Sequence, residues 1–214
     1  MKNHLVELLK DSSIELDSSV LSESAAEDLL LYLTEWERWN AKINLTAESD
    51  ALSVANKHIY ESLQYTRAIA STGSLVDVGS GAGFPGIPVK IILPKLEIML
   101  IESQRKRANF LKTAIHSIGL SKIQCVHGRA EDFSAFVGKY DFVTLRHVLE
   151  PHLSLQLGAS LLHPGGSLIL QTSRENSFQF DFLDSLWLSP VDEIFFKRSS
   201  SSHSKIMVFK RNSS

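Results

Sequence analysis

A glycine-rich stretch with an aspartate in front of it is the part of this sequence best suited to chemistry. Asp77 is followed by Gly79, Gly81, Gly83 and Gly86, after a short apolar run that reads as a buried strand. Glycine has no side chain to hold a ligand away, and it adopts backbone angles that other residues avoid. The stretch therefore predicts a loop at the end of a strand whose backbone N–H groups approach a nucleotide-like ligand.

A second carboxylate lies where a ribose-binding acid is expected. Residues 96–102 read as another strand, and this strand ends in Glu102, which follows Gly81 by 21 positions. Nucleotide-binding βαβ units place an acidic residue about 20 residues beyond the glycines, where it binds the ribose hydroxyls. We therefore expect Glu102 to accept hydrogen bonds from the ribose of a bound cofactor.

The residues around the glycines discriminate between two cofactors. Gly81, Gly83 and Gly86 match the dinucleotide fingerprint, so an NAD-dependent oxidoreductase is one alternative. Asp77 would be unfavourable beside a pyrophosphate, whereas it suits S-adenosylmethionine, which carries a sulfonium and an ammonium group but no phosphate. The sequence also lacks a convincing Tyr-Lys or His-Asp arrangement for a dehydrogenase. The pattern favours S-adenosylmethionine.

The elements that must position these residues alternate along the chain. The sequence predicts a short helix and a polar loop within 1–22, two longer helices at about 24–40 and 50–70, and then an α/β region. In that region it predicts strands at 75–78, 96–101, 122–127, 140–145, 166–171, 190–197 and 204–210, with helices at 86–93, 104–118, 131–137 and 149–162. This order predicts a doubly wound, mostly parallel, Rossmann-like sheet with an antiparallel last strand over 74–214, and a helical segment over 1–73 packed on it.

Composition narrows the class of protein. The chain has 214 residues and a net charge of −2, but residues 1–74 carry −6 and residues 75–214 carry +4, which is compatible with RNA binding. No apolar run approaches 18 residues, so no membrane association is expected. The single cysteine, Cys125, fits a reducing, cytoplasmic compartment and reads as a buried structural thiol. The histidines show no metal-ligand spacing, so we expect no metal, and a monomer is favoured.

Longer motifs resemble a known family. The Asp-x-Gly-x-Gly-x-Gly pattern from Asp77 to Gly83 and the later run 162–170 (Leu-His-Pro-Gly-Gly-Ser-Leu-Ile-Leu) are similar to class I methyltransferases. The continuation Phe84-Pro85-Gly86-Ile87-Pro88, the segment Glu102-Ser103-x-x-Lys106-Arg107 and the N-terminal Asn44-Leu45-Thr46 resemble the bacterial ribosomal RNA small-subunit methyltransferase G family, also called glucose-inhibited division protein B. The resemblance covers most of the chain.

The resemblance implies an activity and a set of site residues. Such proteins transfer a methyl group from S-adenosylmethionine to the position-7 nitrogen of a guanine in 16S rRNA, so the implied partner is 16S rRNA or a small-subunit precursor. The residues implied to contact the cofactor, beyond those already named, are Phe84, Ala130, Glu131 and Arg146, together with Gly79. On the substrate side the candidates are His58, Arg146 and His147. Because this guanine nitrogen carries a lone pair and no proton, we expect no catalytic acid or base.

Four positions depart from the family pattern. Lys57 and Glu61 are conservative changes, the usual Arg-Ala after the fourth strand is Arg146-His147, and Gln171 stands where a lysine is common. The last two lie near the presumed substrate face. They leave open a class I methyltransferase with another target, such as tRNA, a protein or a small molecule.

Overall fold

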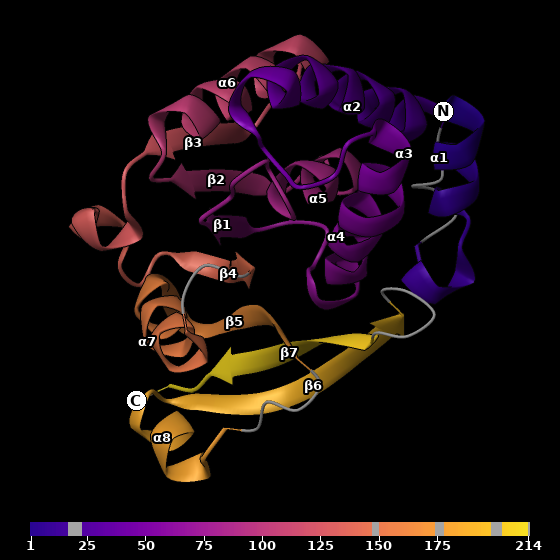
Figure 1. Ribbon diagram of the computed structural model, residues 1–214. Coiled ribbons are helices and arrows are strands. Elements are labelled where there is room, and N and C mark those ends of the chain that lie inside the picture. The colour runs from indigo at the N-terminus through magenta and orange to yellow at the C-terminus, as the bar shows by residue number, and fades with distance from the viewer. Residues whose placement is uncertain (17–22, 147–149, 174–177, 198–202, 214) are drawn as a thin grey trace.

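A seven-stranded sheet forms the centre of the molecule (Figure 1). The computed structural model describes residues 1–16, 23–146, 150–173, 178–197 and 203–213. The strands follow the order β3-β2-β1-β4-β5-β7-β6. Their bounds are β1 Ser74–Val78, β2 Glu97–Glu102, β3 Ile123–His127, β4 Tyr140–Arg146, β5 Leu162–Ser173, β6 Leu188–Lys197 and β7 His203–Arg211.

The direction of the strands confirms the predicted fold class. Strands β1 to β5 pair in parallel, and β7 is antiparallel to both of its neighbours, β5 and β6. The order reverses between β1 and β4, because β1 lies beside β2 on one side and β4 on the other. In open α/β sheets such a switch point is where ligands bind, beyond the carboxyl ends of the strands.

Two apolar cores separate three layers. One core lies between the sheet and helices α2 (Glu23–Ile43), α5 (Gly86–Ile92) and α6 (Arg105–Ile118), and the other lies between the sheet and helices α7 (Pro151–Leu161) and α8 (Phe180–Ser185). Alternate residues of β1 enter opposite cores: Leu75 joins the first, whereas Val76 and Val78 join the second. This alternation follows from the two-residue period of a strand.

The N-terminal segment shares the first core with the sheet. It comprises α1 (Lys2–Leu9), the 3₁₀ turn η1 (Ser12–Ile14), α2, and a continuous helical stretch from Ala51 to Ala68. That stretch begins as α3 (Ala51–Val54), widens into a π-helical turn η2 (Ala55–Ile59), and continues as α4 (Tyr60–Gln64) and the 3₁₀ turn η3 (Tyr65–Ala68). Helix α1 packs on α2, α2 packs on α5 and α6, and α4 packs on α5 and β6 (Figure 1). No helix within the described ranges is long and apolar enough to cross a membrane.

Several boundaries differ from the sequence prediction. Helix α2 extends beyond Asn40 to Ile43, because the terminating residue is Asn44, which adopts a left-handed conformation (φ 49°). The short helical stretch predicted at 131–137 is divided into two 3₁₀ turns, η4 (Ala130–Asp132) and η5 (Ser134–Phe136). They flank Phe133, whose ψ of 77° interrupts helical geometry. Strand β5 starts four residues early, because Leu162 already pairs with Tyr140 of β4.

Candidate cofactor site

The glycine loop continues from β1 and crosses the carboxyl end of β2. The N–H groups of Gly79 and Ser80 both donate to the carbonyl oxygen of Ile101, at 2.8 and 3.1 Å. Gly79, Gly81 and Gly83 all have positive φ, of 67°, 57° and 92°, which other residues rarely adopt. At Gly83 a Cβ atom would also lie 2.7 Å from the Ile87 side chain. Backbone angle and space both explain why glycine occupies this loop.

Glu102 holds the same loop from the end of β2. Its side chain is buried, and its two oxygens accept hydrogen bonds from the N–H groups of Gly81, at 2.8 Å, and Gln104, at 2.6 Å. A carboxylate oxygen has more than one acceptor site, so these bonds leave capacity for ribose hydroxyls. The structure places Glu102 beside the loop, and its binding of a ribose stays a prediction.

Asp77 lies inside the first core, behind the loop. Its carboxylate accepts hydrogen bonds from the hydroxyl of Thr144, at 2.8 Å, and from the N–H of Gly86 at the start of α5, at 3.3 Å. Burial raises the pKa of Asp77 to about 6, against the lowering effect of these bonds. The carboxylate thus ties β1 to β4 and to the first turn of α5.

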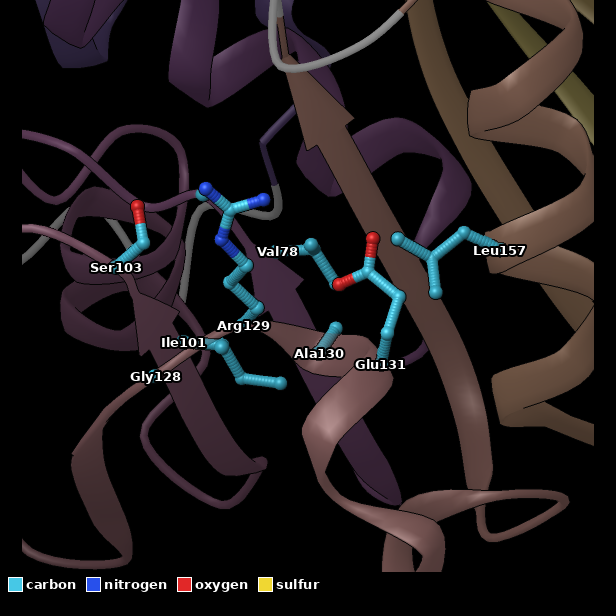
Figure 2. A pocket seen from close by; sticks show the side chains of 9 residues that line it. Val78, Ile101, Ser103, Gly128, Arg129, Ala130, Glu131 and Leu157 are labelled. Atoms are coloured by element: carbon cyan, nitrogen blue, oxygen red, sulfur yellow. The ribbon is translucent and has the colours of Figure 1, made fainter.

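A pocket of about 240 Å³ opens beside the loop, at the carboxyl ends of β1, β2 and β3 (Figure 2). Its lining combines apolar side chains, backbone and a few polar groups: Val78, Gly79, Ile101, Ser103, Gly128, Arg129, Ala130, Glu131 and Leu157. Figure 2 shows the side chains of Arg129, just before the 3₁₀ turn η4, and of Glu131, within it, on either side of Ala130. Apolar walls with a few polar groups are typical of small-molecule sites.

Phe84 and Arg146 belong to a separate cluster beyond the loop. The Phe84 ring is buried and stacks on the imidazole of His58, with centroids 5.0 Å apart and an angle of 22° between the planes. The guanidinium carbon of Arg146 lies 5.4 Å from the centroid of the same ring. None of these three residues lines the pocket described above.

The predicted site residues thus divide into two groups. Gly79, Ala130 and Glu131 line the pocket, and Gly81, Gly83 and Glu102 form or support the loop beside it. The second group is the cluster around Phe84, with His58 and Arg146, while His147 lies outside the described residues.

Sequence reasoning did not single out several lining residues. Ser103 directly follows Glu102, and Gly128-Arg129 directly follows β3, so a rule that inspects the two residues after each parallel strand would find them. Leu157 comes from α7, far along the chain, and no local signal marks it. Cys125 is buried, and burial raises its pKa to about 12, in agreement with a structural thiol.

Comparison with known proteins identifies the family. The model of the family described as "GidB: rRNA small subunit methyltransferase G" matches residues 25–189. A ribosomal RNA small subunit methyltransferase G from Streptococcus pyogenes is 39% identical over 163 residues, which cover 73% of this chain and 69% of that protein. The protein of the same name from Desulfitobacterium hafniense is 39% identical over 149 residues, covering 68% of this chain and 62% of that protein.

Solved structures agree on the fold. A putative transferase from Pyrococcus horikoshii superposes with a TM-score of 0.60 at 16% identity, over 74% of this chain and 64% of that one. M. jannaschii TYW2, solved in complex with AdoMet, superposes with a TM-score of 0.58 at 15% identity, over 72% of this chain and 74% of that one. The family match spans most of the chain, including the loop, the pocket and the Phe84 cluster, and the chain therefore belongs to the rRNA small subunit methyltransferase G family.

Proposed function

We propose that this protein transfers a methyl group from S-adenosylmethionine to the position-7 nitrogen of a guanine in 16S rRNA. Family membership carries the assignment to a small-subunit rRNA methyltransferase. The choice of the guanine nitrogen rests on the motif resemblance from Asp77 to Pro88. We place the activity in the cytoplasm, with the protein acting as a monomer on ribosomal RNA or a small-subunit precursor.

The residues of the pocket fit S-adenosylmethionine. Val78, Ile101 and Leu157 offer apolar surface for an adenine ring, and Glu102, beside the pocket, offers carboxylate oxygens to a ribose. These features suit the adenosine part of either S-adenosylmethionine or NAD, because NAD sites also place an acid on the ribose. The family match supports the methyl donor over the NAD-dependent alternative.

The loop and pocket residues have distinct roles in this proposal. Glu102 binds the ribose and Gly81 at once, so that loop and ligand are held together. Gly79 lets the ligand approach the backbone at the end of β1, and Ala130 and Glu131 contact the edge of the adenine. Asp77 holds the start of α5 in place from behind. All of these groups act by binding and orientation, which is the larger part of what a displacement reaction needs.

The reaction itself needs no proton transfer to the attacking atom. S-adenosylmethionine supplies an activated methyl group on a sulfonium when it is bound. The guanine nitrogen has a free lone pair, so the protein must align it with the methyl carbon and exclude water. Electrostatic groups fixed in advance then favour the movement of positive charge toward the base. Arg146 ends β4 at the carboxyl edge of the sheet, and His58 contacts it from the π-helical turn η2.

Exposed basic residues support an RNA substrate. Arg105 and Lys106 are exposed in the first turn of α6, two and three positions after the pocket residue Ser103. Phosphate groups near the pocket would meet these side chains first. In a duplex the position-7 nitrogen of guanine faces a deep, narrow groove, so we expect an exposed loop or partly assembled RNA as substrate.

Cofactor binding and product identity test the proposal together. Isothermal titration should show binding of S-adenosylmethionine and S-adenosylhomocysteine, and no binding of NAD at the same protein concentration. Mass spectrometry of the methylated RNA should identify 7-methylguanosine. Binding of NAD alone, or a product methylated at another position, would overturn the assignment.

A further inference from the structure

A chain of polar contacts links the N-terminal helices to the end of β4. Glu48, in the loop before α3, contacts both Lys57 and His58 of the π-helical turn η2. His58 contacts Arg146, the last residue of β4, and Arg146 contacts Glu61 of α4. The side chains of Glu48, His58 and Arg146 are only about a tenth exposed, and that of Glu61 is buried. The contacts therefore form away from bulk water, where they are directional and strong.

The partners of His58 define its tautomer. The Nε2 atom lies 2.6 Å from a carboxylate oxygen of Glu48, which can only accept, so Nε2 carries the proton and donates. The Nδ1 atom lies 3.0 Å from Nη2 of Arg146, which can only donate, so Nδ1 accepts. Both contacts are satisfied by one neutral imidazole. Burial, together with the charges of Arg146 and Lys57, lowers the pKa of His58 to about 4, which agrees with the neutral form.

Glu48 stays ionised in this setting. Burial alone would raise the pKa of its carboxyl, but hydrogen bonds from Lys57 and His58 lower that pKa to about 2. An ionised Glu48 is therefore a permanent acceptor for the Nε2 proton. This fixes which nitrogen of His58 remains free to accept from Arg146.

Three groups hold the guanidinium of Arg146 in one orientation. Nδ1 of His58 accepts from Nη2, a carboxylate oxygen of Glu61 accepts from Nη1 at 3.2 Å, and the Phe84 ring lies beneath the guanidinium carbon. The imidazole also stacks on Phe84, so the ring, the imidazole and the guanidinium share one packed unit. Arg146 does not line the cofactor pocket. It lies at the end of β4, with its guanidinium over the Phe84 ring.

We propose that Glu48 and His58 are positioning residues for Arg146: Glu48 fixes the imidazole, and the imidazole fixes the guanidinium at the end of β4, on the side of the site that receives the RNA. The inference rests on the proposed function, because it takes RNA as the second substrate. It assigns a role to the N-terminal helices, which supply the acceptor that Arg146 needs. A guanidinium held in this way presents its remaining N–H groups to a base oxygen or a phosphate with little entropy left to lose.

The direct test is the state of the two side chains in protein without RNA. Correlation spectra of ¹⁵N-histidine-labelled protein should show His58 protonated at Nε2 only, and ¹⁵N relaxation should show a rigid Arg146 guanidinium. In His58→Phe, which keeps the stack on Phe84 and removes both nitrogens, the Arg146 guanidinium should become mobile. An Nδ1-protonated His58, or an Arg146 that stays rigid in His58→Phe, would overturn the proposal. Because these readouts need no methyl transfer, they are independent of the proposed reaction.

Kinetics provide the second test. His58→Phe should lower kcat/KM for the RNA about tenfold to a hundredfold, while the Kd for S-adenosylmethionine changes less than threefold. His58→Asn should recover activity to within about fivefold of the original protein, because the Asn oxygen can occupy the place of Nδ1 and accept from Arg146. Glu48→Ala should have a kcat/KM for the RNA between those of His58→Phe and His58→Asn. The control is His4→Ala, which removes a 2.6 Å contact with Asn56 on the same π-helical turn and leaves Arg146 untouched.

These measurements distinguish a positioning role of His58 from a loss of structure and from a failure of the proposed reaction. Thermal unfolding of each variant shows whether a loss of activity reflects loss of structure, and His58→Asn remains informative if His58→Phe does not fold. Equal activities of the Phe and Asn variants would contradict the proposal, as would a loss of cofactor affinity that accounts for the whole loss of activity. If the original protein does not methylate rRNA, the proposed function fails, whereas the spectra still decide the role of His58.

Discussion

Replacing Glu102 by alanine removes the acceptor shared by the loop and the proposed ribose. In the protein this carboxylate accepts from Gly81 N at 2.8 Å and from Gln104 N at 2.6 Å, and its side chain is buried. A hydrogen bond to a charged group contributes about 1.5–3 kcal/mol. If the ribose hydroxyls add one such interaction, its loss weakens cofactor binding by about tenfold to a hundredfold.

The same substitution should also destabilise the fold modestly. Without Glu102 the N–H groups of Gly81 and Gln104 lose their acceptor, and water replaces it only in part. We expect the free energy of unfolding to fall by about 2–3 kcal/mol. Glu102→Gln keeps the shape and one acceptor oxygen, so it should lie between the original protein and Glu102→Ala in both measurements.

Isothermal titration with S-adenosylhomocysteine, combined with urea denaturation, measures both effects. The matched control is Glu97→Ala at the other end of β2, where the side chain is 68% exposed and its 3.5 Å ion pair with Lys122 is also at the surface. The control should change the Kd less than twofold, as expected for a surface ion pair. A Glu102→Ala variant that is folded and binds the ligand within twofold of the original protein would refute the role assigned to Glu102.

Three further predictions concern the loop, the buried aspartate and the RNA. Gly79→Val should abolish S-adenosylmethionine binding, because a branched side chain at φ 67° is strained and Gly79 lines the pocket. Normal affinity of a folded variant in isothermal titration would contradict this. Because burial raises the pKa of Asp77 from 3.8 to about 6, its contribution to stability is fully present below pH 3.8 and is lost as the pH rises through 6. The unfolding free energy of the original protein relative to Asp77→Asn should therefore fall by up to about 3 kcal/mol between pH 4 and 7 in urea titrations, and a rise would contradict the assignment. RNA affinity should fall with salt, with a log–log slope of roughly −1.5 to −3 from two to four phosphate contacts. A slope near zero in filter binding would exclude Arg105 and Lys106 as phosphate contacts.

The sequence predicts the parts of the site that depend on local backbone chemistry. The loop from Gly79 to Gly83 needs positive φ angles, which only glycine adopts without strain. The glycines themselves therefore mark this loop in the sequence. The strands before it are short apolar runs, and their ends fix where Glu102 and Ala130 lie. Alternation of strands and helices then predicts the parallel sheet and its binding edge.

The parts that depend on tertiary packing are not visible in the sequence. Leu157 lines the pocket because α7 packs against β4 and β5, and nothing near Leu157 in sequence marks that position. Glu48 lies ten positions before His58 in an unremarkable polar segment, and its contact depends on the π-helical turn that presents the imidazole. Helix α8 has six residues and buries only Leu183, so it is too short to show a hydrophobic period.

Methyl transfer from tritiated S-adenosylmethionine tests most directly whether 16S rRNA is the substrate. The acceptors are small-subunit particles, deproteinised 16S rRNA, tRNA and free guanosine, each followed by nuclease digestion and mass spectrometry. We predict label in 16S rRNA, within particles or free, recovered as 7-methylguanosine from one guanine. Equal or greater transfer to tRNA or guanosine, or label at another atom of the base, would contradict it.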